Sequence, residues 1–195
     1  MKKALLLITL GLLLGLSSKA QIGIKAGMNF AQQSGNDQTG YSEKTLDNFQ
    51  FGIFTHKDLI PLLKIRVGLE YAPKGTKWEN DSSYNQTTFN YLELPVLARV
   101  KLGPVYALGG FYGAYAMNGK IETEIDDSDA DFDELSRWDY GMKFGLGFQL
   151  GLGPIHAFVE TDYSFGFQNI NKTAGGDDIK NSVLGVSVGV LLGGK

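Results

Sequence analysis

The sequence predicts an all-β fold: an eight-stranded antiparallel up-and-down transmembrane β-barrel, preceded by a cleaved signal peptide. Three observations lead to this prediction. One 14-residue stretch alternates strictly, the connections between strands alternate between long and short, and the chain begins with a short apolar run behind two lysines. A period of two indicates an extended strand, and a barrel strand in a membrane is apolar on its lipid-facing side only.

The clearest strand is predicted over residues 138–151, WDYGMKFGLGFQLG. Its even-numbered positions are all apolar or aromatic, whereas four of the seven positions on the other face are glycine. Glycine weakens an ordinary exposed strand and indicates crowding or curvature on that face. An apolar face backed by glycine and isolated charge is typical of a barrel strand that is apolar towards lipid and polar towards the lumen.

The N-terminus has the three parts of a secretory signal. Lys2 and Lys3 are followed by the apolar residues 4–16, and small residues precede Gln21. Thirteen residues of helix span roughly 20 Å, which is too short for a hydrocarbon core of about 30 Å. The sequence therefore predicts a signal peptide over 1–20 and an outer-membrane barrel domain over 21–195.

The composition restricts the functional classes. No cysteine is present, which excludes disulfides, thiol catalysis and thiolate metal sites. The chain has 18 basic residues, three of them in the predicted signal peptide, and 21 acidic ones, so the mature net charge is about −6. Without a basic stripe to neutralise phosphates, a nucleic-acid partner is not expected. No cofactor is expected either.

Eight segments alternate well enough to be strands, and they cover residues 22–31, 49–57, 63–78, 88–101, 105–118, 138–151, 155–167 and 181–192. The fourth contains Pro95 near its middle, where the missing N–H interrupts a closed sheet. We expect a β-bulge at that position.

Connection lengths predict the topology. Long loops over 32–48, 79–87, 119–137 and 168–180 follow the odd strands, whereas short turns near Pro61, Pro104 and Pro154 follow the even ones. In an up-and-down barrel the two sets lie at opposite ends. Outer-membrane barrels have short periplasmic turns and long extracellular loops, so both termini are expected in the periplasm.

A soluble barrel of lipocalin type shares this alternation, with the apolar face turned inward around a ligand. The loop asymmetry, the glycine-rich minor face and aromatics near strand ends, such as Trp138 and Phe167, favour the membrane version. The two folds differ in which way the apolar face points.

Four motifs carry a family resemblance: GIKAGMNF at 23–30, YLELP at 91–95, DYGMKFGLGFQ at 139–149 and YSFGFQNI at 163–170. In combination they resemble the PorT-like family of outer-membrane β-barrel proteins. The resemblance implies an eight-stranded barrel in the outer membrane of a Gram-negative bacterium of the Bacteroidetes type, with Pro95 as a family feature. The chain departs from the family in having Asp162 where a basic residue is common and in lacking a terminal aromatic residue.

Strand parity predicts a charge network in the lumen. Four basic and four acidic residues face inward: Lys25, Arg66, Arg99, Lys143, Glu70, Glu93, Glu160 and Asp162. An eight-stranded lumen is just wide enough to be filled by side chains, so paired charges would plug it. The favoured function is therefore a structural or surface-interaction role. The alternative is a narrow pore or a transport or secretion accessory.

A different class of function is also considered, an outer-membrane lipid-modifying enzyme. A lipid hydrolase of this kind would need a histidine beside a serine. The only histidines, His56 and His156, are expected near the periplasmic end and away from Ser164. No catalytic residue is predicted.

The acidic stretch 126–134 contains alternating carboxylates, and Asp127, Asp129, Asp131 and Asp133 are weak candidates for binding Ca²⁺. A solvated loop is the favoured interpretation, and no metal site is predicted. Expected partners are outer-membrane lipids, lipopolysaccharide and the barrel-assembly machinery, with the protein itself a monomer.

Overall fold

The computed structural model describes residues 21–35, 42–79, 84–123, 127–129, 132, 135–173 and 178–193. They form ten strands in one antiparallel sheet. Eight are long and cross the barrel, and two are short. The strands are β1 (Gln21–Ser34), β2 (Ser42–Lys44), β3 (Leu46–Ile60), β4 (Leu63–Glu79), β5 (Tyr84–Leu102), β6 (Val105–Thr123), β7 (Asp127–Asp129), β8 (Trp138–Leu152), β9 (Ile155–Gly166) and β10 (Lys180–Leu192).

The eight long strands close into a barrel. Each pairs with its neighbour in sequence order, from β1 through β3, β4, β5, β6, β8 and β9 to β10. The first and last strands then pair with each other, from Ile22 opposite Leu192 to Ser34 opposite Lys180. Closure removes the exposed sheet edges. The predicted eight-stranded antiparallel barrel is confirmed. No helix long and apolar enough to cross a membrane occurs among the described residues.

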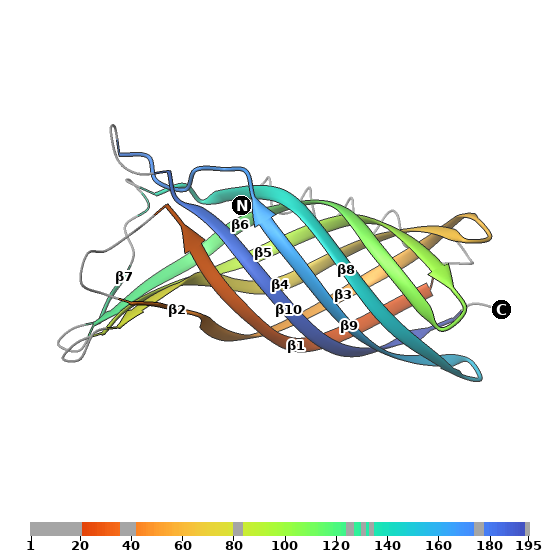
Figure 1. The fold of residues 1–195 in the computed structure, drawn as a ribbon. Coiled ribbons are helices and arrows are strands. Elements are labelled where there is room, and N and C mark those ends of the chain that lie inside the picture. The colour runs from red at the N-terminus through yellow and green to blue at the C-terminus, as the bar shows by residue number, and fades with distance from the viewer. Residues whose placement is uncertain are drawn as a thin grey trace.

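The two ends of the barrel differ, as the connection lengths predicted (Figure 1). At one end, called here the short-turn end, residues 61–62, 103–104 and 153–154 join consecutive strands. Gly103 and Gly153 adopt the positive φ angles that such tight turns require. Gln21 and Gly193 also lie at this end, where the Gln21 side chain donates to the Gly193 carbonyl. The opposite end is called the long-loop end.

The strands are longer at the long-loop end than the sequence predicts. Residues 79–87 were expected to form a loop, but β4 and β5 stay paired up to Glu79 and Tyr84. Likewise β6 continues to Thr123 and pairs with the short strand β7, inside the predicted loop 119–137. These extensions are rich in Asn, Gln, Thr and charge. The extended strands pair by backbone hydrogen bonds, but they have no apolar face there. The alternation of apolar and polar residues in the sequence therefore could not reveal them.

Pro95 does not produce the expected bulge. Its pairing with Tyr112 on β6 is in register, and the shift on that side lies instead between Asn90 and Tyr91. On the β4 side the ladder skips the pairs opposite Pro95 and Leu94 and then resumes in the same register. Gly68 faces this gap, and a Cβ on it would lie 3.4 Å from the Pro95 ring. A local gap beside a glycine accommodates the missing N–H without an extra residue.

The apolar faces of the strands point outward. Along β8 every even-numbered residue from Trp138 to Leu150 is at least partly exposed, and the residues between them point inward. The same holds for Phe49, Phe51 and Ile53 on β3, each more than half exposed. The lipocalin-like alternative is therefore wrong, because the large apolar side chains of these strands do not line a cavity. This surface is suited to lipid.

Glycines on the inner face make room for aromatic rings. Gly23, Gly147 and Gly189 pair across the sheet with Phe54, Tyr106 and Phe158, respectively. A Cβ on any of these glycines would overlap its partner's ring. The inward rings thus cover the bare backbone of these glycines, which is a recognised way of stabilising glycine in sheets. Crowding, inferred from the composition of the 138–151 strand, is the physical reason for the glycines.

Candidate functional site in the barrel lumen

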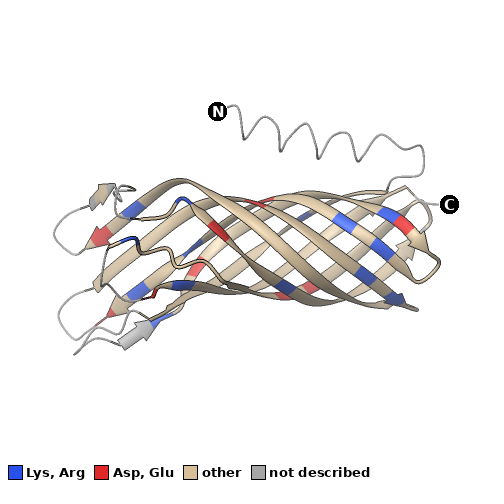
Figure 2. Ribbon diagram, turned by 90° about the horizontal axis from the view of Figure 1, so that it is seen from above, with Lys and Arg blue, Asp and Glu red and all other residues tan. Residues whose placement is uncertain are grey.

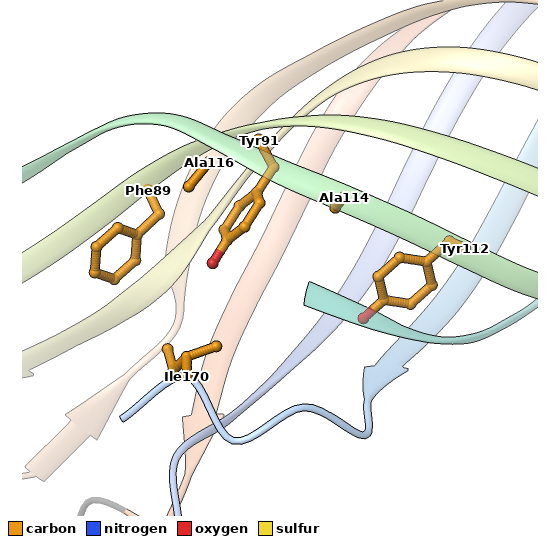
Figure 3. Packing of buried hydrophobic residues seen from close by; sticks show 6 residues of the cluster. All are labelled: Phe89, Tyr91, Tyr112, Ala114, Ala116 and Ile170. Atoms are coloured by element: carbon orange, nitrogen blue, oxygen red, sulfur yellow. The ribbon is translucent and has the colours of Figure 1, made fainter. Parts of the chain in front are cut away.

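The lumen is filled in three layers. Near the short-turn end, an apolar layer is formed by Phe54, Leu97, Tyr106, Leu108, Phe158 and Leu191. Near the long-loop end, a second layer consists of Phe89, Tyr91, Tyr112, Ala114, Ala116 and Ile170. Ile170 belongs to the connection between β9 and β10, which folds over the lumen so that Ile170 faces the two tyrosines (Figure 3).

Between these layers lies a network of charged side chains. Ten charged residues are at most 4 % exposed, five basic and five acidic. They comprise all eight residues predicted from strand parity, together with Lys74 and Asp139. Figure 2 shows the charged positions distributed along the barrel. Their formal charges balance, as charges buried away from water must.

Single strands supply several members of this network because residues separated by two or four positions share a face. Arg66, Glu70 and Lys74 follow one another at four-residue intervals on β4, and Asp139 and Lys143 do so on β8. Lys74 and Asp139 were not among the predicted network residues. Parity on their strands places both on the inner face, so the same signal could have identified them.

The middle of the network alternates in sign. Lys25 contacts Glu70 at 2.9 Å and Glu160 at 3.8 Å. Glu70 also accepts from Lys143 at 3.0 Å, and Lys143 pairs in turn with Glu93. Asp162 makes longer contacts, at 3.7 Å from Lys25 and 3.9 Å from Lys143. Each ammonium group therefore bridges carboxylates from different strands across the lumen.

Towards the long-loop end, the chain of contacts continues through Lys74. Its Nζ lies 2.8 Å from Glu93 and 3.1 Å from Asp139, and 4.0 Å from the centre of the Tyr112 ring. Asp139 Oδ2 accepts further hydrogen bonds from Tyr112 at 3.3 Å and Asn181 at 3.1 Å. Several donors on one carboxylate offset part of the cost of burying it.

Towards the short-turn end, Arg66 is the central cation. Its Nη1 donates to both oxygens of Glu160, at 2.9 and 2.7 Å, and its Nε donates to His56 Nε2 at 3.0 Å. The guanidinium also lies 4.2 Å from the centre of the Phe54 ring. Tyr106 donates to Glu160 at 2.8 Å. His56 is thus a buried structural acceptor in this geometry.

Arg99 is the exception among the eight predicted residues. It donates to the neutral side chain of Gln149 at 2.5 Å and stacks 4.0 Å from the centre of the Tyr106 ring. No carboxylate of the described residues lies within ion-pairing distance of it. The other seven predicted residues join in ion pairs, whereas Arg99 lies at the edge of the network.

The residues weighed for catalysis are far apart. His156 and Ser164 lie on the same strand, β9, separated by eight positions. At about 3.3 Å per residue this is roughly 26 Å, beyond the reach of a nucleophile and its base. Ser164 is buried in the lumen and pairs across the sheet with Lys143 and Val183.

The acidic candidates for Ca²⁺ cannot be placed. Asp131 and Asp133 lie outside the described residues, and only the backbone of Asp127 and Asp129 is described, as part of β7. Among the described residues, no group of three or more His, Asp or Glu side chains is arranged to hold a metal ion.

A closed barrel with an apolar outer wall and a charged interior can now be compared with known proteins. The family model for the outer membrane protein beta-barrel domain matches residues 15–172. The chain belongs to this family. It is therefore an outer-membrane β-barrel, as its apolar outer face requires. None of the curated proteins matches the sequence.

Several solved outer-membrane proteins are similar in structure. Neisserial surface protein A is 14 % identical, with 89 % of this chain and 97 % of that chain covered and a TM-score of 0.48. Ail, the attachment invasion locus protein of Yersinia pestis, is 13 % identical, with coverage of 89 % and 99 % and a TM-score of 0.46. OprG from Pseudomonas aeruginosa is 12 % identical, with coverage of 89 % and 95 % and a TM-score of 0.46.

Proposed function

We propose that this outer-membrane barrel has a structural or surface-interaction role and that its lumen is closed to ions and solutes. The observation that carries the proposal is the balanced network of ten charged side chains, each at most 4 % exposed. Water barely reaches these groups, and in the described part of the barrel they fill the middle of the lumen. The protein therefore binds its partners with its rim and loops and not within the lumen.

Two features add to this closure. The ion pairs join facing strands, so opening the lumen would separate several buried pairs at once, and leaving one charge buried without its partner costs about 3–5 kcal/mol. The apolar layers at both ends of the network also exclude water. Ile170 belongs to the apolar layer near the long-loop end. Its backbone N–H donates to the carbonyl of Ile179, and its carbonyl accepts from the backbone N–H of Ser136. The connections themselves are therefore part of the seal.

Within the outer membrane, we place the short-turn end and both termini in the periplasm and the long-loop end outside the cell. The loop asymmetry supports this orientation. The four sequence motifs support PorT-like membership within the family, and the N-terminal pattern supports a signal peptide over 1–20. Lipids, lipopolysaccharide and the assembly machinery are the proposed partners of a monomeric barrel. We assign it no catalytic activity.

Planar-bilayer recording tests the closed lumen. Purified, refolded barrel is expected to give no steady single-channel conductance, because the network blocks the ion path. The triple variant Lys25→Ala, Glu70→Ala, Lys143→Ala truncates three side chains that meet in the lumen and serves as an opened control, once a heat-modifiability gel shows that it is folded. Steady conductance steps from the wild-type protein would favour the pore or transport accessory instead.

Cysteine labelling tests the orientation, because the natural chain has no cysteine. Thr173→Cys introduces a thiol at the long-loop end, and Pro104→Cys introduces one in a short turn. A membrane-impermeant maleimide is expected to label the first variant on intact cells and the second only after the outer membrane is permeabilised. The reverse pattern would invert the proposed topology.

A further inference from the structure

The inward-facing cations of the described strands fall into two groups. Five of them contact a carboxylate: Lys25, Lys64, Arg66, Lys74 and Lys143. The other two, Arg99 and Lys101, contact none among the described residues. Both lie on β5 at the short-turn end. They are two residues apart, so their side chains share the inner face at a spacing of about 7 Å.

Cross-strand pairing brings further nitrogen donors to the same place. Lys64 lies opposite Arg99, and Lys101 lies opposite the inward-facing Tyr106. His156, at the start of β9, pairs with Gly151 on β8, two residues from Gln149, which accepts a hydrogen bond from Arg99. Of the described residues at this end, Asp58 is the acid that pairs with a member of the group, Lys64, at 2.8 Å. We call this end of the lumen, where Lys64, Arg99, Lys101 and His156 lie, the short-turn mouth. It carries an excess of positive charge.

Several buried nitrogen atoms in this mouth lack hydrogen-bond partners. Arg99 is 1 % exposed, and its Nε has no acceptor. The Nδ1 atoms of His56 and His156 are also buried and unpaired. Since His56 Nε2 accepts from Arg66, its Nδ1 carries the proton and is a donor. Unsatisfied buried donors are uncommon in folded proteins and call for an explanation, such as a bound ion.

The mouth is closed on one side and open on the other. Its inner side is closed by the apolar layer and by Arg66 of the charge network, which contacts both Phe54 and His56. On the outer side Lys101 and His156 are only partly buried, so a solute can approach them from the solvent. Figure 2 shows several basic positions near the end of the barrel where the C-terminus lies.

We propose that the short-turn mouth binds a phosphate group, held by Arg99 and Lys101 on β5 and by His156 on β9. Phosphate combines the negative charge that balances the two unpaired cations with enough acceptor oxygens for several convergent N–H donors. The group can come from a soluble phosphate compound or from the headgroup of a lipid at the rim. This site lies at the opposite end of the barrel from the long loops and shares only Arg99 with the ten-residue network.

Histidine resonances provide a direct test, because the chain contains only two histidines. The full mature barrel, labelled with ¹³C-histidine and held in maltoside micelles free of phosphate, is titrated at constant pH with sodium phosphate. Sodium chloride at equal ionic strength is the control for screening. A saturable shift of the His156 signal is expected with phosphate and none with chloride.

Matched variants assign the shift to the mouth. Lys101→Gln is expected to weaken binding about tenfold, the equivalent of one charge-assisted hydrogen bond. Lys57→Gln removes the same charge from the outer face of β3 at the same end and is expected to leave the affinity within about twofold. His156→Asn, with His56 as the reporter, gives an independent variant if Lys101→Gln proves poorly folded.

The possible outcomes distinguish a soluble phosphate ligand from a lipid headgroup, and both of these from the absence of a phosphate site. Saturation by free phosphate supports a soluble ligand. Saturation only when phosphatidylglycerol is mixed into the micelles supports a lipid headgroup. Absence of saturation with either probe, or equal affinity in the wild-type, Lys101→Gln and His156→Asn proteins, overturns the site. Neither result depends on whether the lumen conducts ions.

Discussion

Lys74 and Arg99 occupy similar positions at opposite ends of the lumen, yet their charges are balanced differently. Each cation lies 4.0 Å from the centre of a tyrosine ring, Lys74 over Tyr112 and Arg99 over Tyr106. Lys74 also contacts two carboxylates, whereas Arg99 has only the amide oxygen of Gln149. A ring face contributes about 0.5–2 kcal/mol to holding a cation, which does not replace a counter-charge.

The difference shows how the barrel divides its interior. From Glu160 to Asp139 every buried cation contacts at least one carboxylate, so this part of the lumen supplies the counter-charges of its own cations. At the short-turn mouth the cations outnumber the acids and remain in reach of solvent. A sealed network stabilises the fold, whereas an unbalanced and accessible one is suited to binding.

The largest expected effect comes from removing one carboxylate of the balanced region. Glu93→Gln leaves Lys74 and Lys143 with one fewer anion and is expected to lower the free energy of unfolding by about 3–5 kcal/mol. Urea unfolding in micelles, followed by tryptophan fluorescence, measures it. Glu122→Gln is the control, because its partner Lys120 is about half exposed and such a pair contributes about 0.2–1 kcal/mol. Equal losses in both variants would contradict the distinction.

A smaller effect is expected from crowding the apolar layer between the two regions. Gly147→Ala places a methyl group against the Tyr106 ring, which is also hydrogen-bonded to Glu160. Overpacking of this kind costs about 1–3 kcal/mol. Gly113→Ala on β6 is the matched control, since nothing lies within 4 Å of its added Cβ. The same unfolding measurement should show no loss for Gly113→Ala, and a comparable loss would mean that backbone freedom, not crowding, explains the glycines.

The smallest effect sharpens the comparison at the mouth. Lys101→Glu supplies Arg99 with the carboxylate it lacks, so it is expected to raise the free energy of unfolding by about 0.5–1 kcal/mol, or a few degrees in Tm. Lys57→Glu on the outer face makes the same charge change without facing Arg99 and should not stabilise the barrel. Thermal unfolding monitored by circular dichroism compares the two. If Lys101→Glu is no more stable than Lys57→Glu, the Arg99 charge does not lack a partner.

The sequence by itself determined the class of fold, the number of crossing strands and the inner face of most of them. Side chains alternate with a period of two along any strand, so parity alone assigned Lys25, Arg66 and the other predicted charges to one side. Glycine content added that the inner face is crowded. The same reasoning would have identified Lys74 and Asp139.

Only the tertiary structure decided which charges meet. Glu93 and Lys74 form an ion pair because of the stagger between β4 and β5. Arg99 has no carboxylate partner because it lies close to the short-turn end of the lumen. Neither result follows from one strand alone. The gap beside Pro95 and the polar extensions of β5 and β6 were missed for the same reason. Partners across a closed sheet are set by the relative shift of all eight strands, and local alternation carries no information about that shift.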